Sequence, residues 1–419
     1  MGRNGMHPAL SPLYAGLGVH REPPSAKQRN IVGHHAMRRD VARGLVLSAL
    51  VVTIVMWSLV AARAATSGSA RPALVFALLM DNRLLAVRVD NGVVAALRTL
   101  APPPRPTALI LAGHYLALGP DGQTLYALTP GDPAHLAIVD VATARIRARY
   151  ALPSGVLARS LAVGSTTGKI YVFGNLPGPQ TIPLGTHVEG VVVLVLDPRS
   201  GSLLGRWVAR RADGHDWLVY QGAVSRDERH LFISYHGPDT TGIDRFALGL
   251  GGLRRCQSAP FPSPRAGVGC LPTHGGFVLY GDEVLASTGT PVVLEMKQSG
   301  RIVRHLDTRL LGNHLMEFAV DEKRAYLTAV GPCGYTGGMS VLAIATGQVR
   351  VLSAPRVSNT ICGERFSPGP TPLLIVGRTT ATVPLQGIPG ALLFLDTRTG
   401  QIRRTVATPA EPIDVAGGR

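Results

Sequence analysis

Short apolar runs separated by polar turns recur along most of the chain. In "FLDTRTGQIRRTV" (Phe394–Val406) an apolar run leads into a polar group around Thr399 and Gly400, and a second run follows. This pattern is typical of two antiparallel strands joined by a tight turn. Glycine fits the left-handed position of such a turn, and aspartate accepts hydrogen bonds from its amides.

Six copies of this hairpin pattern occur at regular distances. Their turn positions are Gly92, Ala144, Gly201, Gly300, Gly347 and Gly400. The separations are 52, 57, 99, 47 and 53 residues. Because 99 is close to twice the other values, a less regular unit is expected near residue 250, and residues 240–256 can supply its two strands. The spacing therefore predicts seven units.

A second hairpin pattern precedes the first in every unit but the first, as in "LALGPDGQTLYALTP" (Leu116–Pro130). Two hairpins make a four-stranded antiparallel blade, and blades repeated around an axis form a β-propeller. The first unit lacks its first strand, whereas "EPIDVA" (Glu411–Ala416) after the last unit resembles an inner strand. We therefore predict that residues 66–419 form an all-β, seven-bladed propeller of four-stranded blades. A C-terminal inner strand in the first blade closes the ring.

The segments Gly119–Leu152 and Phe394–Val406 resemble the YVTN-type surface propellers of bacteria and archaea, a WD-repeat-like family. The resemblance covers most of residues 73–416, although two blades match well and the Gly-His and Trp-Asp dipeptides of WD repeats are absent at the corresponding places. It implies an exported scaffold.

An uncharged apolar stretch of nineteen residues, 44–62, lies between Arg43 and Arg63. A helix of this length covers about 28 Å, close to the roughly 30 Å hydrocarbon thickness of a bilayer. Seven bases precede it, so the positive-inside rule keeps residues 1–43 in the cytoplasm and exports the rest. The sequence predicts a cell-membrane protein with its propeller outside, in an extracellular or periplasmic space.

Residues 37–65 form a signal anchor or a signal peptide. Ala62-Arg63-Ala64 fits a signal-peptidase site, and cleavage near Ala64 would release a secreted protein. The apolar stretch is longer than an ordinary signal core, which favours an uncleaved anchor. Residues 1–36 show no apolar period and are expected to be a disordered leader. Met37 also suits a translation start, in which case this leader is not translated.

The net charge of +16 divides into +6 for residues 1–65 and +10 for the rest, which holds 34 bases and 24 acids. A basic exported body favours anionic partners. An envelope protein, a polysaccharide or an anionic polymer is expected. No run of bases interleaved with aromatic residues occurs, so specific nucleic-acid binding is not expected. We expect a monomer, and scattered arginines that serve solubility are the simpler interpretation of the charge.

All four cysteines lie in the part predicted to be exported, where disulfides form. Four cysteines allow three pairings. Proximity and the repeat favour Cys256–Cys270 and Cys333–Cys362, and reduced cysteines are the alternative. No CxxC pair or Cys/His cluster is present, which argues against zinc.

Loops that lead into inner strands hold the candidate site residues, because propeller ligands bind at the axial channel. The candidates are Asp216, Asn313, His314, Glu317 and Glu364. Imidazole and carboxylate groups could bind a hard cation or transfer protons. Asp216, Asn313 and Glu317 resemble the Asp, Asn and Glu of calcium-dependent propeller lactonases. Turn capping and pairing with arginine is the competing interpretation of all five.

Fold alone assigns no activity, and nucleophile-elbow, zinc-helix and phosphate-loop motifs are absent from the sequence. The sequence favours an exported binding or interaction scaffold without a cofactor. The alternative is a propeller enzyme, either a metal-assisted lactonase-like hydrolase that uses calcium or an oxidoreductase subunit, with its site at the axial channel. The Pro-rich segment Arg254–Gly276 is expected to be an exposed loop tied by the first cysteine pair. It is either a recognition surface or a simple variation in loop length.

Overall fold

The computed structural model describes residues 73–103, 114–130, 133–182, 185–209, 218–236, 240–249, 252–262, 277–287, 292–299, 301–307, 315–320, 323–330, 336–352, 374–376, 380–385 and 390–417. In these residues all regular structure is β, in strands β1 to β28. No helix in this part of the chain is long and apolar enough to span a membrane. The predicted leader and membrane segment, residues 1–36 and 37–65, lie outside the described residues.

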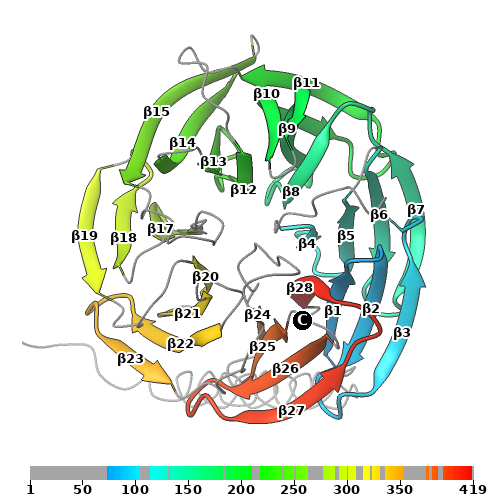
Figure 1. Cartoon of the computed structure of the whole chain (residues 1–419), viewed down its shortest axis with the longest axis vertical. Helices are drawn as coiled ribbons and strands as arrows, with labels where there is room; N and C mark the ends of the chain where they lie inside the picture. Colours follow the sequence, from blue (N-terminus) through cyan, green and yellow to red (C-terminus); the bar gives the residue numbers. More distant parts are fainter. Residues whose placement is uncertain are drawn as a thin grey trace, which may run out of the picture. The chain divides into compact units, whose positions relative to one another are not determined.

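The strands form seven four-stranded sheets in which all neighbours are antiparallel, and the sheets surround a central axis as blades (Figure 1). From the innermost to the outermost strand, the first three blades are β28 (Pro412–Gly417), β1 (Leu74–Leu79), β2 (Arg83–Arg88) and β3 (Val94–Thr99); β4 (Leu116–Leu118), β5 (Thr124–Thr129), β6 (His135–Asp140) and β7 (Arg145–Ala151); and β8 (Leu157–Val163), β9 (Ile170–Ile182), β10 (Gly185–Leu196) and β11 (Leu203–Ala209).

The other four blades follow in chain order. They are β12 (Leu218–Val224), β13 (His230–His236), β14 (Thr240–Gly249) and β15 (Gly252–Pro262); β16 (Phe277–Tyr280), β17 (Glu283–Ser287), β18 (Val292–Lys297) and β19 (Ile302–Asp307); β20 (Leu315–Val320), β21 (Arg324–Val330), β22 (Thr336–Ala343) and β23 (Val349–Leu352); and β24 (Leu374–Val376), β25 (Thr380–Leu385), β26 (Ala391–Asp396) and β27 (Ile402–Ala407).

The double spacing in the repeat corresponds to the fourth blade, whose outer hairpin is β14 and β15. Residues 240–256 lie within this hairpin, so the irregular unit has the strands expected of it. Residues 254–262, the first part of the segment expected to be a loop, instead belong to β15, which pairs as far as Pro262 opposite Thr240. The rest of that segment, residues 263–276, lies outside the described residues. Two prolines were therefore compatible with an outermost strand, which has one unpaired edge.

The first blade is completed by the C-terminal strand. β28 pairs antiparallel with β1, with Phe76 opposite Ala416 and Ala77 opposite Val415. The Met80 amide also donates to the carbonyl of Glu411 over 2.8 Å. Figure 1 shows β28, in red, beside the blue β1. The first and last strands of the described chain thus share one sheet, which leaves no open edge between the first and last blades.

The turns between the third and fourth strands of the blades follow the chemistry expected from the repeated pattern. In the seventh blade, Asp396 Oδ1 accepts hydrogen bonds from the amides of Arg398 (2.7 Å) and Thr399 (3.1 Å). Gly400 has a φ of 72° and donates its amide to the Asp396 carbonyl over 2.8 Å. The amide bonds also lower the pKa of the Asp396 carboxyl. The recurrent phrase is therefore a capped hairpin.

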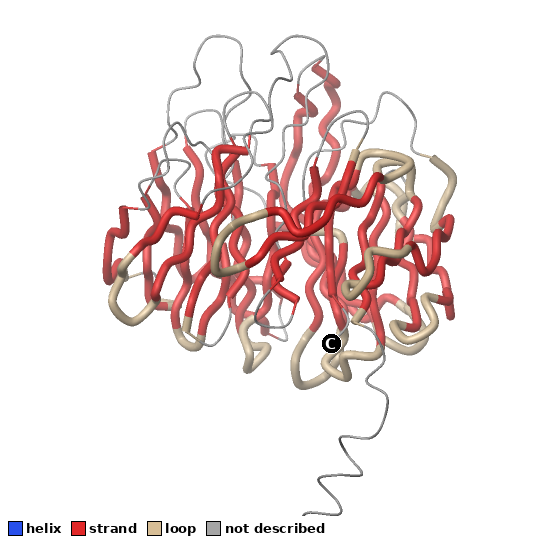
Figure 2. The backbone as a smooth tube through the Cα atoms, turned by 90° about the horizontal axis from the view of Figure 1, so that it is seen from below, coloured by secondary structure: helices blue, strands red, loops and turns tan. Residues whose placement is uncertain are grey.

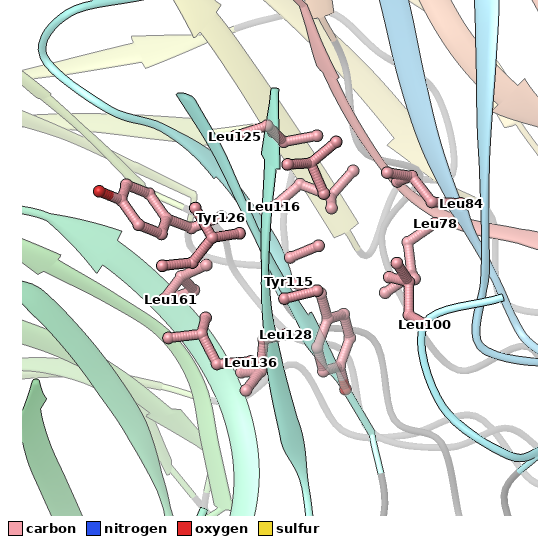
Figure 3. Close-up of a cluster of buried hydrophobic side chains, with 14 of the residues drawn as sticks. Leu78, Leu84, Leu100, Tyr115, Leu116, Leu125, Tyr126, Leu128, Leu136 and Leu161 are labelled. Carbon is pink, nitrogen blue, oxygen red and sulfur yellow. The ribbon is translucent and has the colours of Figure 1, made fainter. Parts of the chain in front are cut away.

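The core lies between blades. One cluster joins the first three blades and includes Phe76, Tyr115, Leu125 and Val192, all of them buried (Figure 3). Its members come from both faces of strands such as β5, whose six residues are all buried. Strands with continuous apolar sequence are thus sandwiched between neighbouring blades, and burial of this area is the main stabilising contribution.

Candidate functional site

Polar side chains near the axis bind the backbone of neighbouring blades. Asp414, on the innermost strand β28, is 1% exposed. Its Oδ2 accepts hydrogen bonds from the amides of Tyr115 (2.6 Å) and Leu116 (2.7 Å), which lead into the inner strand of the second blade. Its Oδ1 accepts from the amide of Val415 over 2.8 Å. The carboxylate therefore connects the closing strand to the next blade.

Burial dominates the ionisation of this group. It raises the pKa of Asp414 to about 6, against the opposing effects of nearby His114 and of the three amides. Burial likewise raises the pKa of Tyr115 and lowers the pKa of Arg159, and the two side chains are hydrogen bonded to each other. Three titratable groups from the inner parts of three blades are thus packed together.

The same kind of connection continues around the axis. Ser160 Oγ on β8 accepts the amide of Gly222 on β12 over 3.0 Å. The Gln221 side chain on β12 donates to the carbonyl of Phe277 and accepts its amide, both over 2.8 Å. Asn175 Oδ1 accepts the amide of Val219 over 3.0 Å. These side chains stabilise the ring by forming hydrogen bonds with the backbone of the neighbouring blade.

Of the five predicted site residues, the structure describes the backbone of one. Glu317 lies on the inner strand β20, opposite Thr328 of β21. Asp216, Asn313, His314 and Glu364 lie outside the described residues, so the structure does not test whether they converge. No group of three or more His, Cys, Asp or Glu side chains suited to a metal occurs among the residues that were described.

The predicted disulfides also stay predictions. Cys256 has its backbone on β15, and Cys270, Cys333 and Cys362 lie outside the described part of the chain.

The outer rim, defined as the seven outermost strands β3, β7, β11, β15, β19, β23 and β27 with the turns that lead into them, is a second candidate region (Figure 1). At five blade junctions a rim side chain donates to a backbone carbonyl in the turn of the next blade. These hydrogen bonds are Arg98 to Ala144, Tyr150 to Arg199, Arg304 to Ile344, Arg350 to Arg398 and Arg404 to Val89. The last of them crosses the ring closure.

The turn glycines allow this close approach. A Cβ at Gly201 would lie 2.3 Å from the ring of Tyr150, and one at Gly92 would lie 2.3 Å from Arg404 Cδ. Both glycines also have positive φ angles, of 65° and 70°. The repeated glycine thus serves both the turn and the contact with the preceding blade.

The rim holds the excess positive charge of the predicted exported body. The seven outermost strands contain eleven arginines and one acid, Asp307. Residues 66–419 hold 34 bases and 24 acids, so the remainder has 23 of each. A guanidinium keeps its charge and spare donors after it binds one carbonyl. The outermost strands are therefore cationic around a balanced body. Three of their arginines, Arg147, Arg304 and Arg403, pair with Asp140, Glu295 and Asp396 of the adjoining strands, and the outward positive charge comes from the others.

Large apolar side chains accompany this charge. The large hydrophobic residues that are exposed in the described part of the chain all belong to the rim: Val93, Val94, Leu97, Leu203, Leu204, Val208, Ile302, Val303, Val351 and Ile402. Isolated exposed apolar residues are normal. Their restriction to the strands that carry the arginines makes the rim a mixed cationic and apolar surface.

In the sequence, the segments that form the rim were interpreted as repeated hairpins, and their arginines as charges that serve solubility. The signal was present in the alternation "ARIRARY" (Ala144–Tyr150), which places Arg145, Arg147 and Arg149 on one face of β7. The axial group around Asp414 carried no comparable signal, because its partners lie 298 and 299 residues away in the chain.

No protein-family model matches the sequence, and no curated protein matches it. The YVTN-type resemblance therefore stays a prediction. Among solved structures, a periplasmic gluconolactonase of Pseudomonas aeruginosa is similar with a TM-score of 0.56 and 18% identity, over 83% of this chain and 99% of that one.

A putative 6-phosphogluconolactonase of Bacteroides uniformis is similar with a TM-score of 0.55 and 12% identity, over 83% and 99% of the two chains. The dihydro-heme d1 dehydrogenase NirN has a TM-score of 0.47 and 14% identity, over 83% and 75%. The likeness to the gluconolactonase and to the putative 6-phosphogluconolactonase establishes the all-β propeller fold, and at these identities it establishes no chemistry.

Proposed function

We propose that this protein is an exported, membrane-anchored β-propeller that binds an anionic polymer or surface of the cell envelope through its outer rim. The observation that carries the proposal is the charge distribution, since the outermost strands hold eleven arginines against one acid and the rest of residues 66–419 is balanced. Clustered charge of one sign attracts a polyanion and raises its local concentration.

Chemistry of the rim side chains suits this role. Arg145, Arg147 and Arg149 are exposed and alternate along β7, so their Cα atoms follow one another at about 6.6 Å. Guanidinium groups bind carboxylate, sulfate and phosphate oxygens in bidentate geometry. Exposed apolar residues on the rim such as Leu97 would add contacts with the polymer that do not depend on its exact sequence.

A lactonase-like hydrolase is the alternative, and two structural neighbours carry lactonase titles. Such an enzyme needs metal ligands or acid–base groups that face a substrate in the axial channel. Asp414, Ser160 and Gln221 are instead bonded to the backbone of adjacent blades. The described part of the axis therefore favours a scaffold role, and hydrolysis of gluconolactone by the purified protein would favour the enzyme.

Binding to polyphosphate and polygalacturonate, with neutral dextran as the reference, tests the proposal on the full chain in detergent. A double variant, Arg145→Gln with Arg206→Gln, removes two exposed rim charges. We expect its affinity for both polyanions to fall at least threefold, and binding by the native chain to weaken as salt rises.

The matched control is Lys169→Gln with Arg229→Gln, which removes two exposed charges from turns between the first and second strands of blades. It should bind as the native chain does. Equal losses for the two double variants would contradict a rim site, and binding of neutral dextran with the same affinity would contradict charge recognition altogether.

A further inference from the structure

The exposed apolar residues of the rim concentrate at one end of the outermost strands. Seven of the ten lie at the first or second residue of an outermost strand, or directly before the strand: Val93, Val94, Leu203, Leu204, Ile302, Val303 and Ile402. They follow the turn between the third and fourth strands in the first, third, fifth and seventh blades. Because the blades are antiparallel, all these turns lie on the same face of the ring. Loops and turns, drawn in tan, line much of the lower edge of Figure 2.

The chain enters the propeller on this face. Ala73, the residue before β1, accepts a hydrogen bond from the amide of Val89 over 2.9 Å, and Val89 begins the turn that leads to Val93 and Val94. The predicted membrane segment ends at Ala62, eleven residues earlier. Eleven residues reach at most about 40 Å when fully extended. With the predicted segment in a membrane, a tether of this length would limit the distance of Ala73 from the bilayer.

Arginines stand beside the apolar residues. The first three positions of the outermost strands hold seven arginines and no acid: Arg145, Arg147, Arg254, Arg304, Arg350, Arg403 and Arg404. Three of them, Arg147, Arg304 and Arg403, form ion pairs with Asp140, Glu295 and Asp396 of the adjoining strands. Apolar side chains that enter the headgroup region and basic residues that contact anionic lipids are the two components of interfacial membrane binding. Arginine also combines an apolar stem with a charged head.

We propose that this end of the rim rests on the anionic phospholipid surface of the membrane in which residues 44–62 are inserted. The proposal rests on the proposed function and deepens it by naming the anionic surface. Apolar residues on four blades spread around the circumference would match a planar partner that is wider than one blade. A peptide or a small protein ligand would instead need a continuous groove.

A photocrosslinking experiment in lipid nanodiscs tests this placement with the full chain. The photoreactive residue p-benzoylphenylalanine replaces either Leu203, the first residue of β11, or Val208, the sixth. The two side chains are 46% and 44% exposed, and the positions are about 17 Å apart along one strand. The control therefore matches the test site in exposure and strand, and differs in distance from the entry face.

In nanodiscs of phosphatidylglycerol and phosphatidylcholine, we expect at least fivefold more lipid adduct at Leu203 than at Val208. The Leu203 adduct should decrease in nanodiscs of phosphatidylcholine alone. Equal adduct yields at the two positions, or absence of lipid adducts at Leu203, would overturn the docking proposal. Crosslinks from Leu203 to a co-purified protein in place of lipid would overturn it as well.

Sodium carbonate extraction of membranes separates this failure from failure of the anchor. A chain that stays in the membrane but yields no Leu203 adduct refutes the docking and leaves the anchored scaffold intact. A chain that is extracted refutes both the anchor and the docking. Both substituted positions are exposed, so thermal melting should equal that of the native chain and shows that each variant is folded.

Discussion

The buried carboxyl of Asp414 should make the stability of the propeller depend on pH between about 4 and 6. Burial raises its pKa to about 6, from an ordinary value of 3.8. A raised folded-state pKa means that the folded state binds a proton more tightly than the unfolded state over this range. Stability from this group is therefore fully present below pH 4 and is lost as pH rises through 6. A shift of about two pKa units corresponds to about 3 kcal/mol.

The substitution Asp414→Asn removes the titration while keeping an oxygen for the amides of Tyr115 and Leu116. Its new NH₂ group would face the Val415 amide, at a pH-independent cost of about 1 kcal/mol. We expect native stability relative to Asp414→Asn to decrease by about 3 kcal/mol from pH 4 to pH 7. Urea unfolding of both proteins at pH 4, 5, 6 and 7 measures this difference.

The exposed Asp282→Asn substitution, in the turn after β16, controls for the change in net charge. A stability difference between native protein and Asp414→Asn that stays constant from pH 4 to 7 would refute the reasoning. So would a difference that grows in favour of the native protein as pH rises, because that sign requires a lowered folded-state pKa.

Two other outcomes follow from the fold, and a third follows from the sequence. Gly201→Ala should destabilise the protein by about 1–3 kcal/mol more than Gly122→Ala in thermal melts. Both glycines have φ above 60°, but only at Gly201 would the new Cβ meet a side chain, the ring of Tyr150. Equal losses would contradict this contact. Deletion of residues 411–419 removes β28 and should abolish cooperative unfolding in calorimetry, whereas an unchanged melt would show that closure is dispensable. Non-reducing peptide mapping should link Cys256 to Cys270 and Cys333 to Cys362, and a Cys256–Cys333 peptide would show that the predicted pairing is wrong.

Local chemistry explains how much of the fold the sequence could predict. In the third and seventh blades, Asp197 and Asp396 each cap two amides, and Gly201 and Gly400 adopt a positive φ, so these hairpins are visible in the residues themselves. The spacing of those turns then located the irregular β14 and β15. The missing first strand of the opening unit indicated the role of β28.

Contacts between distant segments were not predictable in the same way. The bonds from Asp414 to Tyr115 and Leu116 join residues about 300 positions apart, and no pattern near Asp414 distinguishes it from a surface aspartate. The end of β15 was misjudged because prolines are compatible with an outermost strand. Predicting the rim requires knowing which strand of each blade is outermost. The clustering of the arginines is recognisable once the seven outermost strands are placed in the ring.

Arginine footprinting tests the central claim, that the outer rim is the binding surface, most directly. The full chain is modified with phenylglyoxal with and without polyphosphate, and the modified peptides are measured by mass spectrometry. Arg145 and Arg206 on the rim should be protected severalfold, while Arg226 and Arg229, exposed in the turn before β13, should react as in the free protein. Protection of Arg226 and Arg229 with continued reactivity of Arg145 and Arg206 would contradict the account.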